Sequence, residues 1–161
     1  MTGSKRLIRT LKERGLTIAT AESLTGGLLG ASLVDVPGAS AAYLGGVCTY
    51  TDRIKHKLLG VSKESLRLYG AVSETVAIEM ANGIRQKLDA DIAVSTTGFA
   101  GPDSDGDIPV GRVYVGVSTR AGTCYAVRFD FSGARNLIRK EAARAAIDEI
   151  LLLLGKDGKI K

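Results

Sequence analysis

Hydrophobic side chains recur along this chain with two different periods, and each period predicts a different kind of element. Residues 5–14 place Leu7, Ile8 and Leu11 on one helical face, and Gly15 follows as a stop signal. This spacing predicts an amphipathic helix at the start of the chain. Further helices are predicted at about 26–34 and at 134–154, the latter stopped by Gly155. Three more are predicted from their N-caps: one capped by Asp52 that ends at Leu59, one capped by Ser62, and one capped by Ser73 that ends at Lys87.

Short apolar runs bounded by glycine and polar residues predict the strands. They span 17–20, 43–50, 92–97, 111–119 and 123–131. The last two form an expected hairpin through the turn at 120–122. Because α-β units alternate with a hairpin, we expect an α/β fold with a mixed sheet covered by helices on both faces.

Composition places the chain among ordinary globular proteins. It has 161 residues, of which 45% are hydrophobic and 24% charged, so we expect a single domain over 1–161 with a real core. No apolar run approaches the roughly 20 residues of a membrane span, and the N-terminus lacks a signal-peptide core. The expected location is therefore cytoplasmic. Cys48 and Cys124 lie in apolar runs and are expected to be buried free thiols.

Charge and aromatic content narrow the class of ligand. The net charge is +5, it is spread along the chain, and tryptophan is absent. Nucleic-acid binding usually needs a denser basic stripe with interleaved aromatic residues, so we expect no nucleic-acid and no membrane partner. A small anionic ligand suits this charge better. With one histidine and no CxxC pair, the sequence predicts no metal site and no cofactor.

Three polar, glycine-rich clusters follow predicted strands. They span 21–27, 49–57 and 96–107. In open α/β sheets, ligands bind beyond the carboxyl ends of the strands. The three clusters are therefore candidate walls of one pocket.

The first cluster contains Ser23 between a strand and a helix. A hydroxyl at this place can be exposed beside backbone amides that could hold an oxyanion or a phosphate. Gly26 and Gly27 would let a ligand approach the backbone closely. The alternative is that Ser23 or Thr25 merely caps the helix, and spacing alone favours that alternative.

The second cluster offers bases for a serine nucleophile, which is weak at neutral pH without one. His56 is the single histidine, and a Ser-Lys pair is the recurring substitute for Ser-His. A lysine could act only if burial or a neighbouring cation lowered its pKa. Tyr50 could relay the proton or hold the lysine in place. Spacing leaves Lys55 and Lys57 open, and the alternative is a solvated helix face.

The third cluster combines a glycine-rich turn at 98–102 with an acidic stretch at 103–107. Such a turn can hold phosphate, although it does not match a P-loop, and the acidic stretch lacks the pattern of a calcium loop. We interpret it as a turn-rich lid or a hairpin loop. Arg135 opens the last helix, where the helix dipole disfavours a cation. It is either a phosphate or carboxylate ligand or a surface arginine.

Taken together, these clusters resemble the CinA C-terminal domain family, whose enzymatic members are nicotinamide-nucleotide amidases. The matching stretches occur in the expected order over nearly the whole chain. They are TAESLTGG (20–27), TYTDRIKHKLLGV (49–61), GAVSE (70–74), STTGFAGP (95–102), PVGRV (109–113) and FSGAR (131–135). The resemblance implies a three-layer α/β/α sandwich, self-association into a homo-oligomer, and hydrolysis of nicotinamide mononucleotide to nicotinic acid mononucleotide and ammonia.

The resemblance also assigns roles to residues. Ser23 falls at the nucleophile and Lys55 at the catalytic lysine, while Tyr50 and Thr97 fall at further functional positions. The expected substrate-binding residues are Thr25, Gly26, Gly27, Gly98, Gly101 and Arg135.

This chain departs from the family pattern at three places: Leu24 stands where cysteine is frequent, Ile108 where lysine is usual, and Ala134 where aspartate is usual. The competing interpretation is a non-catalytic module that binds nucleotides or other proteins.

Overall fold

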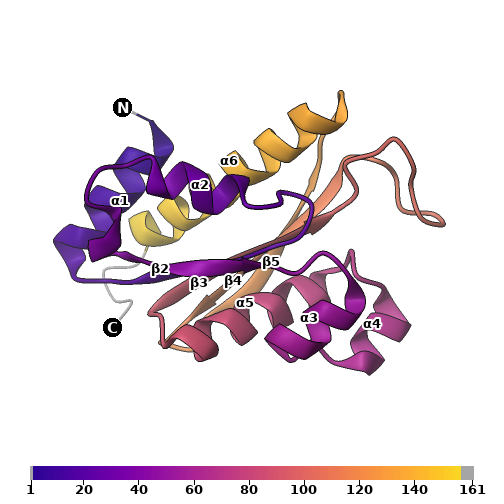
Figure 1. The fold of residues 1–161 in the computed structure, drawn as a ribbon, viewed down its shortest axis with the longest axis horizontal. Helices are drawn as coiled ribbons and strands as arrows, with labels where there is room; N and C mark the ends of the chain where they lie inside the picture. Colours follow the sequence, from indigo (N-terminus) through magenta and orange to yellow (C-terminus); the bar gives the residue numbers. More distant parts are fainter. Residues whose placement is uncertain (1, 157–161) are drawn as a thin grey trace.

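A mixed sheet lies between two layers of helices in the computed structural model, which describes residues 2–156 (Figure 1). The elements follow one another as α1 (Gly3–Arg14), β1 (Ile18–Glu22), α2 (Leu28–Val34), a 3₁₀ turn (Ala39–Ala41), β2 (Tyr43–Cys48), α3 (Asp52–Leu59), α4 (Lys63–Tyr69), α5 (Glu74–Leu88), β3 (Ile92–Gly98), β4 (Arg112–Thr119), β5 (Cys124–Asp130) and α6 (Arg135–Lys156).

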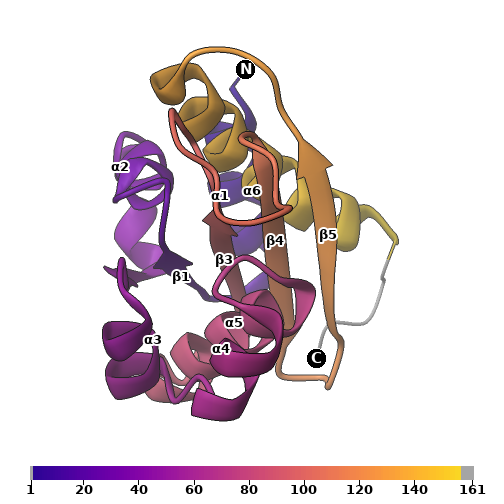
Figure 2. The same ribbon diagram turned by 90° about the vertical axis from the view of Figure 1, so that its right-hand side faces the viewer.

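The sheet has five strands in the order β2-β1-β3-β4-β5. Strands β2, β1 and β3 are parallel, with Ala21 paired to Val47 on one side and to Ser95 on the other. The hairpin β4–β5 continues the sheet in antiparallel orientation (Figure 2). The three parallel strands therefore end at the same edge of the sheet.

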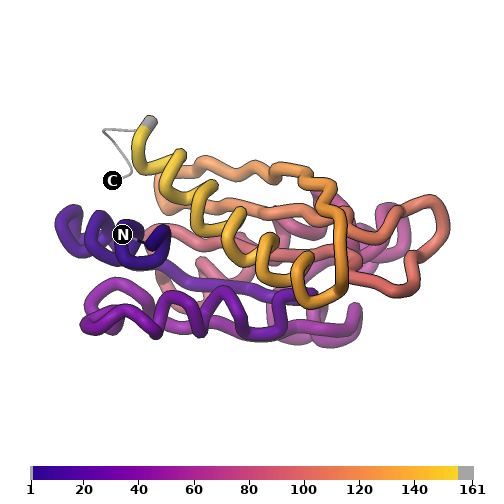
Figure 3. Tube along the Cα trace, turned by 90° about the horizontal axis from the view of Figure 1, so that it is seen from above, coloured from indigo at the N-terminus to yellow at the C-terminus, as the bar shows by residue number. Residues whose placement is uncertain are grey.

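Helices cover both faces, which confirms the predicted three-layer α/β/α sandwich. Helices α1, α2 and α6 pack together on one face, and α6 runs over the sheet (Figure 3). Helix α5 crosses the other face with α3 and α4 beside it. Because both faces are covered, every residue of β1 is buried. No helix within residues 2–156 has both the length and the apolar character that crossing a membrane requires.

The predicted caps and helix faces are mostly confirmed. Leu7, Ile8 and Leu11 are all buried against the core, as their spacing predicts. The Ser62 hydroxyl accepts from the amides of the first turn of α4, and the Ser73 hydroxyl accepts from the first turn of α5. The predicted Asp52 cap is wrong. Thr51 holds the N-cap position and Asp52 is the first helical residue.

Several boundaries differ from the prediction for identifiable reasons. Strand β1 reaches Glu22 because neighbours on both sides extend the ladder. Helix α2 begins at Leu28, since Gly26 and Gly27 adopt left-handed conformations with φ of 55° and 97°. Helix α6 continues through Gly155.

Both cysteines are exposed, which contradicts the prediction that they are buried. Cys48 lies on β2 and Cys124 on β5, the two edge strands of the sheet. Exposure alternates along β2, and Cys48 falls on the exposed side. The apolar runs around both residues suggested burial, but the rest of the protein covers only some of the side chains of an edge strand.

Helix α5 packs closely against the sheet at Gly116. A Cβ atom there would lie 2.2 Å from the carbonyl oxygen of Ala77 and 2.5 Å from Ser95 Oγ. We expect Gly116→Ala to lower the free energy of unfolding by about 2–3 kcal/mol, because α5 must move outward. Urea unfolding measures this loss. Gly155→Ala is the control, since a Cβ there meets nothing within 4 Å, and equal stability of the two variants would contradict the prediction.

Candidate active site

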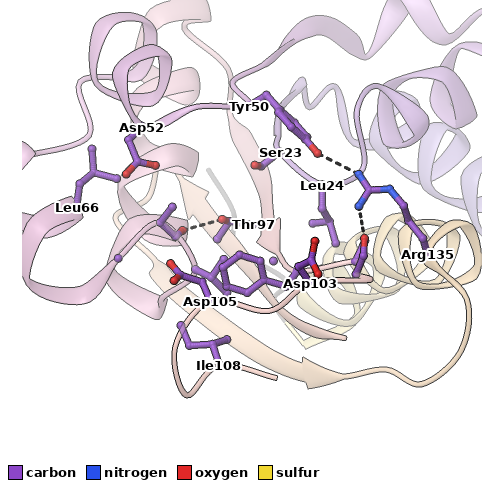
Figure 4. Close-up of a pocket in the computed structure, with 17 residues that line it drawn as sticks. Ser23, Leu24, Tyr50, Asp52, Leu66, Thr97, Asp103, Asp105, Ile108 and Arg135 are labelled. Carbon is purple, nitrogen blue, oxygen red and sulfur yellow. Dashed lines mark hydrogen bonds between the residues drawn. The ribbon is translucent and has the colours of Figure 1, made fainter. Parts of the chain in front are cut away.

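The carboxyl ends of β1, β2 and β3 bring the three predicted clusters to one edge of the sheet, around a cavity of about 430 Å³ (Figure 4). Side chains from all three clusters and from α6 line it. They include Ser23, Leu24, Tyr50, Asp52, Thr97, Asp103, Asp105 and Arg135. The volume lies within the range of small-ligand sites.

Ser23 is the first residue after β1. Its amide donates to the carbonyl oxygen of Thr96 at 3.0 Å, which extends the pairing of β1 with β3 by one residue. The chain then leaves the sheet in the turn 24–27. Ser23 is 7% exposed and lies in the cavity wall, so its hydroxyl is within reach of a ligand there.

Lys55 reaches the same hydroxyl from α3. Its Nζ lies 2.9 Å from Ser23 Oγ and 2.7 Å from the carbonyl oxygen of Thr49, and the side chain is 1% exposed. Lys57 is exposed, and the His56 ring is bonded to the carbonyl of Val61 at 2.8 Å. The structure therefore pairs Ser23 with Lys55 and with neither of the other two bases.

Burial lowers the pKa of Lys55 from 10.5 to about 8, because a desolvated ammonium is disfavoured. The carboxylate of Asp52, one turn earlier in α3, opposes this effect and raises the pKa. Lys55 Nζ donates to Ser23 Oγ and to the carbonyl oxygen of Thr49. When the amine is neutral, its lone pair can instead accept the Ser23 hydroxyl proton while one N–H still donates to Thr49. Such an amine can act as a base near neutral pH.

Tyr50 and Arg135 meet at the rim of the cavity. An Arg135 nitrogen donates to the Tyr50 hydroxyl at 3.0 Å, and another donates to the carbonyl of Gly101 (Figure 4). Tyr50 is 62% exposed. Its hydroxyl therefore faces Arg135, whereas Lys55 contacts Ser23 directly, so proton transfer between those two needs no tyrosine relay.

Thr97 and Gly98 end strand β3 in the cavity wall. The buried Thr97 hydroxyl donates to the carbonyl of Ala71 at 2.7 Å and so ties β3 to the loop before α5. At Gly98, a Cβ atom would lie 2.6 Å from the carbonyl oxygen of Arg112. The close approach of β4 therefore already requires a glycine at this position.

Three of the predicted substrate-binding residues do not line the cavity. The buried Thr25 hydroxyl bonds to the Thr96 hydroxyl at 2.7 Å. The Gly26 amide donates to the carbonyl of Ser23 at 3.1 Å, and the Gly27 amide donates to the Glu22 carboxylate at 2.9 Å. These two amides are occupied within the protein, so neither is free to hold an anion.

Sequence reasoning missed two residues that hold the turn after Ser23. Glu22 accepts from the amides that open α2, and Arg139 on α6 donates to carbonyls of the turn. A signal for Glu22 was present, because Gly27, at the N-cap of α2, offers no capping side chain. For Arg139 the only signal was its place one turn after Arg135.

Fold and site together define a three-layer α/β protein with a buried Ser-Lys pair beside a cavity at the strand ends. The model of the CinA C-terminal domain matches residues 2–154, and the chain belongs to that family. It is 41% identical over 154 residues to a CinA-like protein of Thermotoga neapolitana, a match covering 95% of this chain and 37% of the relative. A CinA-like protein of Chlorobaculum tepidum is 44% identical over 153 residues, covering 92% and 36%. The chain thus spans about a third of the length of the curated relatives it matches.

Solved structures agree with this fold. The competence/damage inducible protein CihA of Agrobacterium tumefaciens superposes with a TM-score of 0.90 at 36% identity, over 95% of this chain and 93% of that one. A CinA superfamily protein of Klebsiella pneumoniae superposes with a TM-score of 0.93 at 35% identity, over 96% and 97%.

Proposed function

We propose that this chain hydrolyses the carboxamide of nicotinamide mononucleotide to give nicotinic acid mononucleotide and ammonia. The observation that carries the proposal is the 2.9 Å contact between Lys55 Nζ and Ser23 Oγ in the wall of the cavity. A buried amine whose pKa is lowered to about 8 is the base that a serine nucleophile needs.

The proposed reaction proceeds by acyl transfer. Neutral Lys55 removes the Ser23 proton while Oγ attacks the carboxamide carbon, which gives a tetrahedral oxyanion. The Lys55 ammonium then protonates the departing nitrogen, so ammonia leaves and an ester to Ser23 remains. Lys55 next takes a proton from water, which attacks the ester, and Ser23 regains its proton as the carboxylic acid departs.

The oxyanion needs hydrogen-bond donors beside Ser23. Gly26 and Gly27 cannot supply them, because their amides are bonded within the protein. The amides of Leu24 and Thr25 have no acceptor among residues 2–156, although both residues are buried. The amide that follows a nucleophilic serine is a recurring oxyanion donor. We assign this role to Leu24 and Thr25.

The charges around the cavity suit a ligand with charge of both signs. Asp52, Asp103 and Asp105 line it together with Arg135. The pyridinium ring of nicotinamide mononucleotide is cationic and its phosphate is anionic. We assign the phosphate to Arg135, which would exchange its bonds to Tyr50 and Gly101 for the ligand.

Ammonia release from a panel of amides tests the proposal. The panel is nicotinamide mononucleotide, nicotinamide riboside and free nicotinamide, and the Ser23→Ala variant supplies the blank. We expect the mononucleotide to have the highest kcat/KM, because it alone presents a phosphate to Arg135. No release above the blank with any of the three would overturn the proposal. Binding of the mononucleotide without turnover would then favour a non-catalytic binding module.

The pH dependence offers a separate check. Only the neutral amine can act as a base, so kcat/KM should rise about tenfold per pH unit below the Lys55 pKa of about 8 and level off above it. Asp52 stabilises the ammonium, so Asp52→Asn should lower this pKa and move the rise to lower pH. A pH-rate profile unchanged by this substitution would contradict the assignment of Lys55 as the base.

A further inference from the structure

Arg139 contacts the nucleophile turn from the side of α6. Its Nε donates to the carbonyl oxygen of Leu24 at 2.8 Å, and its Nη2 donates to that of Thr25 at 3.1 Å. The remaining terminal nitrogen lies 3.2 Å from Asn136 Oδ1. Arg139 does not line the cavity, and all three of its nitrogens are engaged within the protein. It is therefore arranged to hold backbone rather than ligand.

Glu22 holds the same turn through its amides. Its carboxylate is 2% exposed and accepts from Gly27 at 2.9 Å, Leu29 at 3.1 Å and Gly30 at 2.8 Å. No basic side chain pairs with it among residues 2–156, so the amides that open α2 are the groups that compensate its charge. The turn is thus held by the Glu22 carboxylate at its last amide, that of Gly27, and by the Arg139 guanidinium at two of its carbonyls.

The carbonyl contacts also decide where the free amides point. In a trans peptide the C=O of one residue is opposite to the N–H of the next. Since Arg139 binds the Leu24 carbonyl, the Thr25 amide points away from α6. The Ser23 carbonyl accepts from Gly26, which in the same way orients the Leu24 amide. Neither the Leu24 amide nor the Thr25 amide has an acceptor among residues 2–156.

We propose that Arg139 is a positioning residue that holds the Leu24–Thr25 peptide in the orientation that presents the Thr25 amide, next to the Leu24 amide, to the oxyanion formed at Ser23. This inference rests on the proposed amidase reaction. It predicts an effect on the chemical step and not on substrate binding, because the guanidinium touches neither the cavity nor Lys55. A Leu24–Thr25 peptide released from Arg139 could rotate and turn its carbonyl toward the developing negative charge.

The test compares Arg139→Met with Arg144→Met. Arg144 lies on the same helix, where its side chain is 72% exposed and makes only surface ion pairs. We expect Arg139→Met to lower kcat by about 10- to 100-fold with KM changed less than about threefold, since losing one oxyanion donor outright costs about 100- to 1,000-fold. Arg144→Met should match the wild type. A kcat within threefold of wild type in Arg139→Met, or a rise in KM equal to the fall in kcat, would overturn the proposal.

Arg139→Lys covers the case in which the methionine variant does not fold. One ammonium cannot bind both carbonyls in the fixed geometry of a guanidinium, so the kcat of Arg139→Lys should be at least about fivefold below that of wild type. It should still be higher than the kcat of Arg139→Met, if that variant folds. A lysine variant with wild-type kcat would overturn the proposal.

A second readout separates this inference from the choice of substrate. A fluorophosphonate that labels serine nucleophiles forms a tetrahedral adduct needing the same donors, so its rate of reaction at Ser23 should fall with Arg139→Met. If wild type releases no ammonia but labelling depends on Arg139, the substrate assignment fails and the positioning role stands. Equal labelling rates, or no labelling of Ser23 in wild type, would overturn the positioning role.

Discussion

Replacing Ser23 with alanine should lower ammonia release from nicotinamide mononucleotide by at least about 1,000-fold, because no other hydroxyl contacts Lys55 among the described residues. The side chain is small and makes one hydrogen bond, so the melting temperature should stay close to that of wild type. Residual turnover would reflect binding and the oxyanion donors alone. Continuous ammonia detection and thermal unfolding together measure the two effects.

Ser32→Ala is the matched control for this substitution. Ser32 lies on α2 on the far side of the turn, and its hydroxyl donates to the carbonyl of Leu29 at 2.7 Å. It should retain wild-type turnover. If Ser23→Ala also retains turnover while it remains folded, Ser23 is not the nucleophile. If both variants lose activity and stability together, the loss reflects folding rather than chemistry.

Replacing Lys55 with methionine should abolish turnover and at the same time stabilise the protein. The base is removed, so we expect kcat to fall at least about 1,000-fold. The folded protein binds the Lys55 proton with a pKa of about 8, against 10.5 for an ordinary lysine. This difference costs up to about 3 kcal/mol of folding free energy at pH 7, at about 1.4 kcal/mol per pKa unit. Methionine fills the same space without a charge and removes that cost.

The pH dependence of this stabilisation fixes its origin. The unfolded chain holds the Lys55 proton up to about pH 10.5 and the folded chain only up to about pH 8, so the cost is fully present below pH 8. It disappears as pH rises from 8 to 10.5. Urea unfolding should therefore show a gain for Lys55→Met at pH 7 that shrinks by pH 10.

Lys57→Met is the control for Lys55→Met, since Lys57 is the exposed lysine of the same helix. It should change neither kcat nor the free energy of unfolding appreciably. A Lys55→Met variant that is less stable than wild type at pH 7 would show that the contacts of Lys55 with Ser23 and Thr49 outweigh its desolvation. Such a result would contradict a strongly lowered pKa.

Much of the architecture was predictable because it depends on short-range spacing. The i, i+1, i+4 spacing of Leu7, Ile8 and Leu11 indicates α1, and the serines at 62 and 73 begin helices because their hydroxyls satisfy nearby amides. The alternation of strands and helices predicted a mixed sheet covered by helices on both faces, and the resemblance to the family implied the three-layer sandwich. Parallel strands end at one edge, so the meeting of the three polar clusters also followed from the pattern.

Other features depended on contacts between residues far apart in the chain. The burial of Cys48 was predicted wrongly because an apolar run does not reveal whether its strand lies at an edge. Asp52 was predicted as a cap, but the structure places it beside the cavity, where it acts on the pKa of Lys55. The Gly26 and Gly27 amides were predicted to contact a ligand, but in the structure they donate to the Ser23 carbonyl and the Glu22 carboxylate.

The sequence by itself determined the elements, their order and the two residue types, serine and lysine, from which a site could be built. Only the tertiary structure decided which lysine could act as the base for Ser23. Desolvation depends on everything that packs around a side chain, and α3 turns Lys55 into the protein and Lys57 into water. The tertiary structure likewise brought Lys55 within 2.9 Å of a hydroxyl 32 positions earlier in the chain, a distance that no local pattern encodes.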